Sequence, residues 1–583
     1  MPNAFRKLYI LFSHFIIDHH QRIRSWSLFY ILVLAIFMLS DHFLDVLQWN
    51  SQDMSVRIKS IEQMFGMTGL LKILIFYCTL TFATLPLLLS RNRYIRSASF
   101  GILFFFISLD ISYQFINSSG FSHAEATTML YETKMIGSAL TYYTSPIIKS
   151  ILVTILLTAP LIIIAWRKMP KIKVRYGLVA PCLILLYILT STTGKLNAYF
   201  PALYRIPCST YFAFASKERF QQNFGARTQP KIRARNKAIA RQIVMIVDET
   251  VRGDHLGING NPVQTTPFLD SIKEKYFNFG IACAASNLSS SSNIIMQTGI
   301  RLQQLPSEAL ISRNLSTIFQ YAKQAQLQTR YIDGQILNTE PQNFMRKVDF
   351  KYIDQFHPIR ATHSALKEHE VDYKIIETLK NDFKSSNPSF TYIVKNGSHF
   401  AYDNKYPPDL KFPFENADYQ YIDPAIRDML KHYHKAIYWG VDRFVKRLYE
   451  EFEGTDTIII YTSDHGESFF WYGGTHGWPK EAGPEQANVP LLIFPMNMNE
   501  QMEKLQRFSP DKNLNRASHF QVFPTLLSWF GFDESEFLHI YGDNLAVPNQ
   551  EKRFFFSGDV LGQGEHTINA FDDAPAQETK AGN

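Results

Sequence analysis

Residues 457–468 read TIIIYTSDHGES. The first half is a short apolar run rich in β-branched residues, and the second half is a turn that carries Asp464 and His465. Residues 243–250, IVMIVDET, have the same form and bring Glu249 to the end of another apolar run. Continuous apolar strands of this kind are typical of a parallel sheet covered by helices on both faces. The two stretches therefore predict an α/β domain.

Further apolar runs at 391–394 and 490–494 extend the predicted sheet, and helices are expected from Ser316 to Gln326 and from Ala425 to Glu451. In open α/β sheets, sites lie beyond the carboxyl ends of the strands. Three of the four predicted strands end in residues that can bind a metal ion. We therefore expect one site at this edge of the sheet.

Glu249, Asp464 and His465 form the predicted ligand set. Two carboxylates and one imidazole suit zinc and leave a position open for a reacting group. Taken alone, the segment from Ser463 to Gly466 is also compatible with an ordinary turn. Its combination with Glu249 at a second strand end favours a metal site.

A nucleophile is expected beside this metal, because a hydroxyl becomes an effective nucleophile when a metal lowers its pKa. The serine-rich run from Ser286 to Ser292 lies between the two metal-binding strands and precedes an apparent helix from Asn293 to Gly299. A helix amino terminus offers N–H groups and a positive dipole to a phosphate. Serine runs more often serve as caps or loops, but the position of this one favours catalysis.

His399 and His476 occupy loops rich in small residues. They are expected to stabilise phosphate charge, to protonate a leaving group or to hold a second metal. The alternative interpretation is that both are ordinary solvent-exposed loop histidines.

The amino-terminal third is much more apolar than the rest of the chain. Its basic clusters, at 91–96 and 167–175 and before the first apolar stretch, fall in alternate loops. Cytoplasmic loops carry the Lys/Arg excess, so the amino terminus is expected in the cytoplasm and everything after about residue 195 in the periplasm of a Gram-negative cell. Five stretches approach the roughly 20 residues that cross a bilayer: Trp26 to Ser40, Leu71 to Leu89, Ser97 to Ile116, Pro146 to Trp166, and Tyr176 to Thr193.

The predicted organisation has four parts. Residues 1–194 form a transmembrane domain, and the aromatic and basic segment 195–242 bridges along the membrane surface. Residues 243–568 form the catalytic domain, and 569–583 a disordered tail. Asp110 lies within the third stretch, where it either has a function or simply reaches the interface.

Charge and cysteine content narrow the possible functions. The net charge is +7 without a clustered basic motif, which argues against a nucleic-acid partner. The chain has four cysteines, of which Cys208 and Cys283 lie outside the predicted spans and could pair. None has zinc-finger spacing, so any metal is held by histidine and carboxylates.

At these residues the chain resembles the lipopolysaccharide phosphoethanolamine transferases. That family includes lipid A enzymes linked to polymyxin resistance and enzymes that modify core sugars. The resemblance spans nearly the whole chain. It is carried by ETVRGDH at 249–255 with Thr265-Thr266-Pro267, by Gly397-Ser398-His399 before Tyr406-Pro407-Pro408, by Ser463 to Ser468, and by His476-Gly477.

The resemblance implies an α-helical domain with five membrane spans and a periplasmic sulfatase-like, or alkaline-phosphatase-like, α/β domain. Glu249, Asp464 and His465 then bind one zinc ion, with a second ion during catalysis as an option, and a phosphorylatable residue is the fourth contact. Spacing favours Ser289 as that residue, with Ser286 and Ser290 as alternatives. His399 and His476 carry over as contacts to the substrate phosphate or as ligands of the second metal.

The implied activity is transfer of phosphoethanolamine from phosphatidylethanolamine to lipopolysaccharide, through a phosphoserine, by a monomer in the inner membrane. The family usually has threonine where this chain has serine, and its lipid A enzymes typically carry several disulfides. The low cysteine content leaves core heptose, another envelope glycan or a protein open as acceptors beside lipid A.

Other classes fit less well. A glycerol-phosphate transferase of the lipoteichoic-acid-synthase type shares the architecture, but the first metal motif and the Tyr-Pro-Pro segment argue against it. A true sulfatase needs a formylglycine motif, whereas Cys283 is followed by Ala284, Ala285 and Ser286. A non-enzymatic sensor or scaffold is disfavoured because the whole predicted ligand set and both loop histidines are present.

Overall fold

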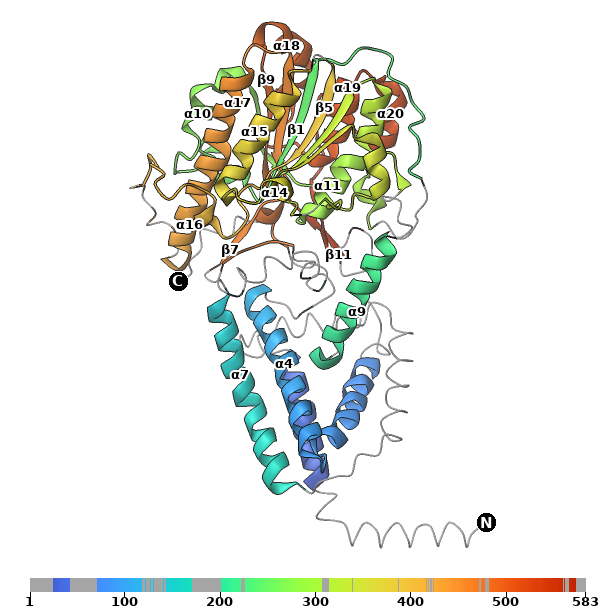
Figure 1. Ribbon diagram of the computed structural model, residues 1–583, viewed down its shortest axis with the longest axis vertical. Helices are drawn as coiled ribbons and strands as arrows, with labels where there is room; N and C mark the ends of the chain where they lie inside the picture. Colours follow the sequence, from blue (N-terminus) through green and yellow to red (C-terminus); the bar gives the residue numbers. More distant parts are fainter. Residues whose placement is uncertain are drawn as a thin grey trace. The chain divides into compact units, whose positions relative to one another are not determined.

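The computed structural model describes residues 25–41, 71–117, 143–169, 201–221, 226–306, 314–337, 339–385, 387–415, 424–470, 473–477, 482–558 and 566–572, with isolated positions 121, 126, 129, 140, 417, 419, 422 and 560. The chain divides into two compact units, Met1–Phe220 and Gln221–Asn583 (Figure 1). The division falls inside the predicted bridging segment, at the end of helix α9 (Ala202–Gln221).

Unit 1 is helical. Three of its described helices are long and apolar enough to cross a membrane: Leu71–Leu88, Arg93–Ile116 within α4 (Arg93–Asn117), and Thr144–Arg167, which combines α7 (Thr144–Ile163) with a π-helical turn. A shorter apolar helix, Ser25–Asp41, coincides with the first predicted span. The fifth predicted span, 176–193, lies outside the described residues.

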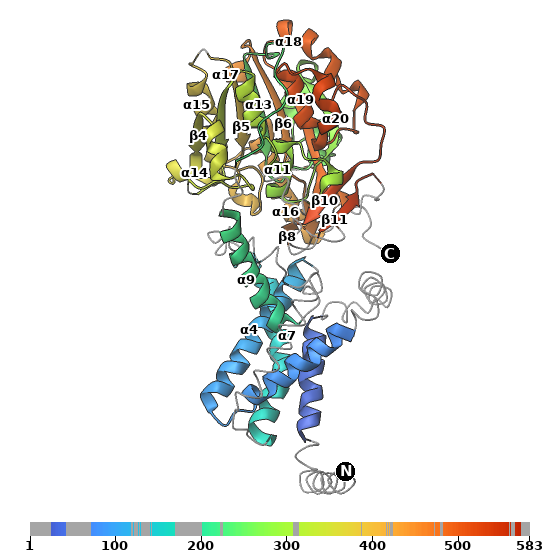
Figure 2. The ribbon, with the colours of Figure 1, turned by 90° about the vertical axis from the view of Figure 1, so that its right-hand side faces the viewer.

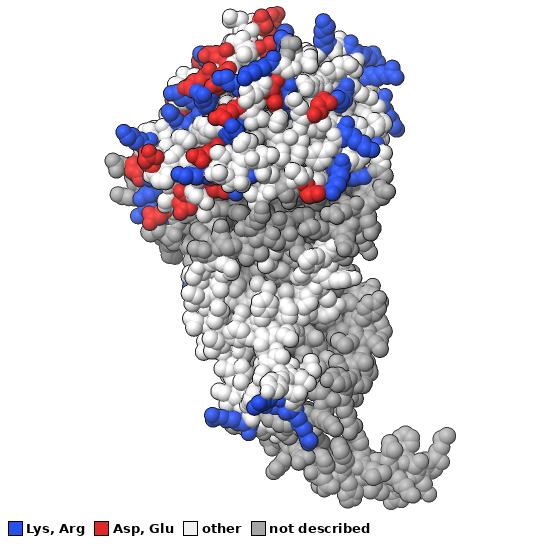
Figure 3. All heavy atoms as spheres, in the orientation of Figure 1, with Lys and Arg blue, Asp and Glu red and all other residues white. Residues whose placement is uncertain are grey.

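Exposed Arg91, Arg93 and Arg167 flank these helices. Figure 3 shows basic side chains gathered at one end of unit 1, while the rest of its described surface carries hardly any charge on the face in view.

A buried polar cluster joins four helices of unit 1. Asp110 of α4 is completely buried and forms an ion pair with Arg205 of α9 at 2.6 Å. Asp41 accepts hydrogen bonds from the Tyr77 hydroxyl at 2.6 Å and from the Ala202 amide at 3.0 Å. Asp110 therefore lies inside the helical unit rather than at its surface.

Unit 2 is built on a seven-stranded sheet with the order β2-β9-β6-β1-β5-β3-β4. The parallel strands β1, β3, β4, β5 and β6 include three of the four predicted apolar runs. Their bounds, with those of the other two strands, are β1 Gln242–Asp248, β2 Phe277–Cys283, β3 Gln328–Asp333, β4 Gln355–Pro358, β5 Ser389–Val394, β6 Thr457–Ser463 and β9 Asn488–Pro495.

The expectation that the run at 490–494 continues a parallel sheet is wrong, because β9 pairs antiparallel with both β6 and β2. Parallel strands require a crossover connection, usually a helix. The described part of the β6–β9 connection instead holds a short hairpin, β7 (Ser468–Phe470) with β8 (Gly473–Thr475), and a 3-10 turn. Strand β9 therefore starts at the edge where β6 ends and runs back.

Helices cover both faces of the sheet because side chains of each strand alternate between two cores. Ile243, Met245 and Val247 of β1 enter one core, and Val244 and Ile246 enter the other. The first core includes α13 (Ile318–Gln324), α19 (Val522–Trp529) and α20 (Glu534–Tyr541); the second includes α15 (Val371–Asp382), α16 (Pro424–Ile437) and α17 (Phe444–Phe452) (Figure 2).

The predicted helix from Ala425 to Glu451 is thus two helices joined by a π-helical turn, Tyr438–Arg443.

The carboxyl end of the domain extends beyond the predicted boundary at 568. Strand β11 (His566–Ala570) pairs antiparallel with β10 (Phe554–Gly558). Phe571 is buried, and Asp572 receives hydrogen bonds from the Arg553 backbone and guanidinium. Residues 569–572, whose composition predicted a disordered tail, are held by backbone pairing and by this ion pair. Residues 573–583 lie outside the described part.

Candidate metal centre

Neighbouring parallel strands bring the predicted ligands together. Glu249 follows β1, while Asp464 and His465 follow β6, and the two strands pair up to Asp248 and Ser463. The Asp464 amide donates to the Asp248 carbonyl at 2.9 Å. One ligand atom from each of Glu249, Asp464 and His465 lies within 4.8 Å of the others, and all three residues are buried.

The imidazole of His465 is oriented for coordination. Its Nδ1 lies 2.7 Å from the Gly466 carbonyl oxygen, which can only accept, so Nδ1 carries the proton. Nε2 faces the carboxylates, 3.4 Å from Glu249 Oε1 and 3.5 Å from Asp464 Oδ2. A backbone partner on one ring nitrogen commonly fixes a metal-binding histidine in this way.

The charges in this cluster are tightly coupled. Burial raises the pKa of Asp464 well above its usual range, and the neighbouring Glu249 adds to the shift. For Glu249, burial is outweighed by the hydrogen bond and charge of His465, which hold its pKa well below the usual range. Burial lowers the pKa of His465, but Asp464 and Glu249 outweigh it and raise that pKa to about 10.

The donor set fits a divalent cation. Asp464 Oδ2 is buried and accepts no hydrogen bond of ordinary geometry within the described part of the chain. An unpartnered buried carboxylate oxygen is costly unless a cation or donor faces it. Two carboxylates and one neutral imidazole nitrogen are ligands that zinc prefers. Glu249, Asp464 and His465 would hold such an ion.

The serine run begins a helix. Helix α11 spans Ser289–Thr298, so it starts four residues before the predicted Asn293. Serine is unfavourable inside helices but well tolerated in the first turn, which explains the difference. Ser289 Oγ lies 3.1 Å from His465 Nε2 and 3.3 Å from Glu249 Oε1.

The other serines have different surroundings. Ser286 is completely buried, and its hydroxyl accepts from the Leu288 amide at 3.3 Å. Ser292 contacts His519 Nδ1 at 3.2 Å. Ser290 is partly exposed, and no contact of its hydroxyl with Glu249 or His465 is seen among the described residues. Of the three predicted candidates, Ser289 is the one placed at the metal cluster in this part of the chain.

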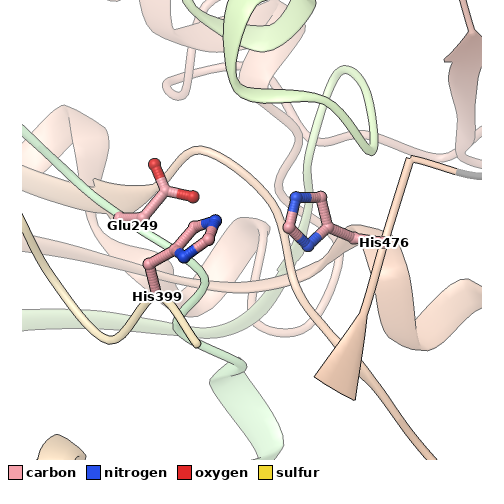
Figure 4. A group of neighbouring side chains, drawn as sticks. All are labelled: Glu249, His399 and His476. Atoms are coloured by element: carbon pink, nitrogen blue, oxygen red, sulfur yellow. The ribbon is translucent and has the colours of Figure 1, made fainter. Parts of the chain in front are cut away.

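A second cluster shares Glu249 and adds both loop histidines (Figure 4). One ligand atom each of Glu249, His399 and His476 lies within 4.8 Å of the others, and both imidazoles are partly exposed. The His476 ring packs on that of His465, with centroids 3.9 Å apart. Burial and the nearby His465 charge lower the pKa of His476. The histidines thus lie at the more accessible side of the cluster.

Two residues of this region were not predicted from the sequence. The Lys395 ammonium is fully buried, forms an ion pair with Asp248 and lies 3.5 Å from Asp372. Gln335 Nε2 donates to Glu249 Oε2 at 2.6 Å. Lys395 directly follows an apolar strand, and this position could have indicated a buried charge. Nothing in the sequence around Gln335 indicates its contact with Glu249.

Gly397 explains the close approach of the histidine loop. Its φ of +53° is in the left-handed region, and a Cβ there would lie 2.4 Å from Asp248 Oδ1 and 2.6 Å from the Glu249 nitrogen. Only glycine fits this position without displacing the strand end.

The chain is similar to one family and to several known proteins. The profile of the family described as Sulfatase matches residues 241–532. The Kdo(2)-lipid A phosphoethanolamine 7''-transferase of Salmonella typhimurium is 24% identical over 306 residues, which cover 49% of this chain and 47% of that protein. Its Escherichia coli K12 counterpart is 24% identical over 318 residues, 50% of this chain and 51% of that protein. The chain therefore spans about half the length of these curated relatives.

Solved structures show a similar fold. The integral membrane protein lipooligosaccharide phosphoethanolamine transferase A (EptA) from Neisseria meningitidis superposes with a TM-score of 0.58 at 16% identity, covering 86% of this chain and 96% of that one. The periplasmic domain of EcEptC from Escherichia coli, in complex with Zn, gives 0.50 at 16% identity over 60% of this chain and 99% of that one.

Proposed function

The chain belongs to the sulfatase family, within the group that includes the lipopolysaccharide phosphoethanolamine transferases, and we propose that it transfers phosphoethanolamine from phosphatidylethanolamine to lipopolysaccharide. The observation that carries the proposal is the position of Ser289. Its hydroxyl lies at the first residue of α11, within 3.1 Å of His465 and 3.3 Å of Glu249. A hydroxyl at a buried anionic cluster and a helix amino terminus suits phosphoryl transfer.

In this proposal Glu249, Asp464 and His465 would hold one zinc ion, and Ser289 would be the fourth contact. A bound zinc ion lowers the pKa of a coordinated hydroxyl and offsets negative charge on a phosphate. The chain supplies the remaining parts. The N–H groups of the first turn of α11 face phosphate oxygens, and His399 and His476 hydrogen-bond to the phosphate and pass a proton to the leaving oxygen.

The reaction proceeds in two steps. The Ser289 hydroxyl gives up its proton and its oxygen bonds to the donor phosphorus while the bond from phosphorus to the glycerol oxygen breaks. That oxygen takes up a proton from His399 or His476, and diacylglycerol leaves. A hydroxyl or phosphate oxygen of the acceptor then bonds to the same phosphorus. The bond to Ser289 breaks, and its hydroxyl is restored by a proton. Ser289 carries phosphoethanolamine, as a phosphodiester, between the steps.

Chain organisation and relatives support the proposed acceptor and location. Three described helices can span a membrane, and two relatives are named for transfer to Kdo(2)-lipid A. The proposal is an inner-membrane monomer with its amino terminus in the cytoplasm and its catalytic unit in the periplasm. The acceptor is the core sugar region, including heptose, or lipid A.

Mass analysis of the purified, zinc-loaded full chain after incubation with phosphatidylethanolamine tests donor and nucleophile together. We expect a phosphoethanolamine adduct on the α11 peptide and release of diacylglycerol. Ser289→Ala abolishes the adduct, whereas Ser290→Ala, its neighbour in the same turn, retains it. The result that overturns the assignment of Ser289 is an adduct that survives in Ser289→Ala and is lost in Ser286→Ala or Ser290→Ala.

Phosphatidylglycerol is the control donor. A glycerol-phosphate adduct from it, with no adduct or diacylglycerol from phosphatidylethanolamine, would replace the proposal with the glycerol-phosphate transferase alternative. An enzyme that forms the phosphoethanolamine adduct but leaves lipopolysaccharide unmodified would direct the search to another envelope glycan or a protein acceptor.

A further inference from the structure

Gln335 follows β3 and reaches the carboxylate of Glu249. Its Nε2 donates to Glu249 Oε2 at 2.6 Å and to the backbone oxygen of Lys395 at 2.9 Å. A carboxylate and a carbonyl can only accept, so the amide nitrogen must face both. This single side chain connects the ends of three neighbouring strands, β3, β5 and β1.

The turn that carries Gln335 is held by a buried carboxylate. Asp333 Oδ1 accepts from the backbone amides of Gln335 and Ile336, both at 2.9 Å. Asp333 Oδ2 accepts from the Tyr331 hydroxyl at 2.9 Å and from Gln342 Nε2 at 2.7 Å. Asp333 is completely buried. The contact between Gln335 and Glu249 is therefore formed by a turn that is fixed independently of any ligand.

The two oxygens of Glu249 consequently have different surroundings. Oε2 takes the short hydrogen bond from Gln335, and Ser289 Oγ lies 3.4 Å from it. Oε1 is 2.8 Å from the Thr250 hydroxyl, 3.3 Å from Ser289 Oγ and 3.4 Å from His465 Nε2. Oε1 is thus the oxygen nearer to His465, while Ser289 lies at almost the same distance from both oxygens.

We propose that Gln335 is a positioning residue for the metal centre: by binding Oε2 it presents Oε1 of Glu249 to the cation. This inference rests on the proposed zinc site and adds a residue outside the ligand set. Partners that hydrogen-bond to a ligand commonly change metal affinity by about 10–100-fold when they are removed. A rotated Glu249 would also change the space available to Ser289.

Zinc affinity of the full chain in detergent, measured by competition with a chromophoric chelator, tests the proposal. Gln335→Met keeps the length of the side chain but removes both N–H donors. Gln320→Met is the control, because the Gln320 side chain likewise holds backbone groups, accepting from the Thr317 amide and donating to the Thr228 oxygen. We expect the zinc dissociation constant to rise about 10–100-fold in Gln335→Met and to stay unchanged in Gln320→Met.

Thermal unfolding without zinc accompanies each measurement, because loss of side-chain hydrogen bonds lowers stability in both variants. Should Gln335→Met not fold, Gln335→Ala keeps the backbone bond to Asp333 and is expected to weaken zinc binding in the same direction. An unchanged dissociation constant in the folded Gln335 variant, or an equal rise in both Gln335→Met and Gln320→Met, overturns the inference.

The affinity measurement also separates this inference from the proposed function. A wild-type chain that does not bind zinc contradicts the metal centre and the inference together. Selective loss of affinity in the Gln335 variant, in a chain that forms no adduct with phosphatidylethanolamine, supports the inference and contradicts the donor assignment alone.

Discussion

Asp464 has opposite effects on the chain without metal and on the chain with a cation bound. Its buried carboxylate lies beside Glu249, and burial followed by that neighbour raises its pKa well above the usual range. Asp464→Asn removes this charge and keeps the shape. We expect the zinc-free variant to melt higher, because relief of the burial cost and of the repulsion by Glu249 outweighs the lost attraction to His465.

Zinc distinguishes this effect from a general gain in stability. A ligand present at 100 times its dissociation constant adds about 2.7 kcal/mol to the native state. Asp464→Asn should lose most of that gain, so its melting temperature responds little to added zinc. Thermal unfolding with a chelator and with zinc checks both parts; a variant that melts lower without zinc, or is stabilised by zinc as strongly as wild type, would contradict them.

His519 predicts an acid-sensitive core. Its Nδ1 accepts from the Ala285 amide at 3.2 Å, and its Nε2 lies 2.9 Å from the Thr462 hydroxyl. Burial lowers the pKa of His519 from 6.5 to about 3. Between these two pH values the His519 imidazole is protonated in the unfolded chain and neutral in the native chain. The contribution of His519 is complete above pH 6.5 and falls as the pH drops toward 3, by up to about 1.4 kcal/mol per pH unit.

His519→Gln tests this sign. The amide can replace part of the hydrogen bonding but takes up no proton. At neutral pH we expect the variant to be less stable than wild type, because glutamine replaces the hydrogen bonds of His519 only in part. As the pH falls, we expect the variant to lose less stability per pH unit than wild type. Urea unfolding of both chains at several pH values measures how the free energy of unfolding changes with pH. Equal slopes for wild type and His519→Gln would show that another group causes the loss of stability at low pH.

At the scale of elements, Lys395 connects the end of β1 with the loop after β5, and both contribute residues to the site. Its ammonium binds Asp248, next to Glu249, and donates to the Gly440 carbonyl at 2.5 Å. It also lies 3.5 Å from Asp372, whose oxygens accept from the amides that lead toward His399. One buried cation thus supports both the β1 end and the loop after β5.

Lys395→Met is expected to cost about 3–5 kcal/mol, because it leaves buried carboxylates unpaired. Arg227→Met is the control, since Arg227 forms a similarly buried ion pair with Asp349. Urea unfolding should show a large loss in both variants, while chelator competition should show weaker zinc binding only in Lys395→Met. Equal zinc affinities in the two variants would mean that Lys395 supports the fold without organising the site.

Elements also show how far sequence reasoning reaches. The apolar runs of β1, β5 and β6 are visible locally, so Glu249, Asp464 and His465 could be assigned to strand ends. The direction of β9 depends on the form of its connection, which hydrophobic periodicity does not encode. Gln335 and Lys395 could not be placed, because their partners Glu249 and Asp248 lie 86 and 147 residues away in the chain.

At the scale of the whole molecule, the residues of the two hydrophobic cores that flank the sheet all lie within unit 2, Gln221–Asn583. We therefore expect a fragment of residues 221–583 to fold alone and to bind zinc as tightly as the full chain. Tethering to a bilayer raises the effective concentration of lipid donors, commonly by about 10²–10⁴ in apparent affinity. The fragment should form the serine adduct with detergent-dispersed phosphatidylethanolamine but react much more slowly with vesicles.

Circular dichroism, chelator competition and adduct mass spectrometry on the fragment measure these three properties. A fragment that unfolds would show that unit 1 stabilises the catalytic fold. Equal rates for fragment and full chain on vesicles would show that unit 1 contributes nothing to donor capture.

The ion pair of Asp110 with Arg205 has a consequence for biosynthesis. The two residues are 95 positions apart, so Asp110 leaves the ribosome first. At about 5–20 residues per second, several seconds pass before its counter-ion is made. We expect the helix that carries Asp110 to stay beside the protein-conducting channel during that time, and to be released into lipid once Arg205 emerges. Site-specific crosslinking of arrested nascent chains, ending before or after Arg205, would reveal that delayed release.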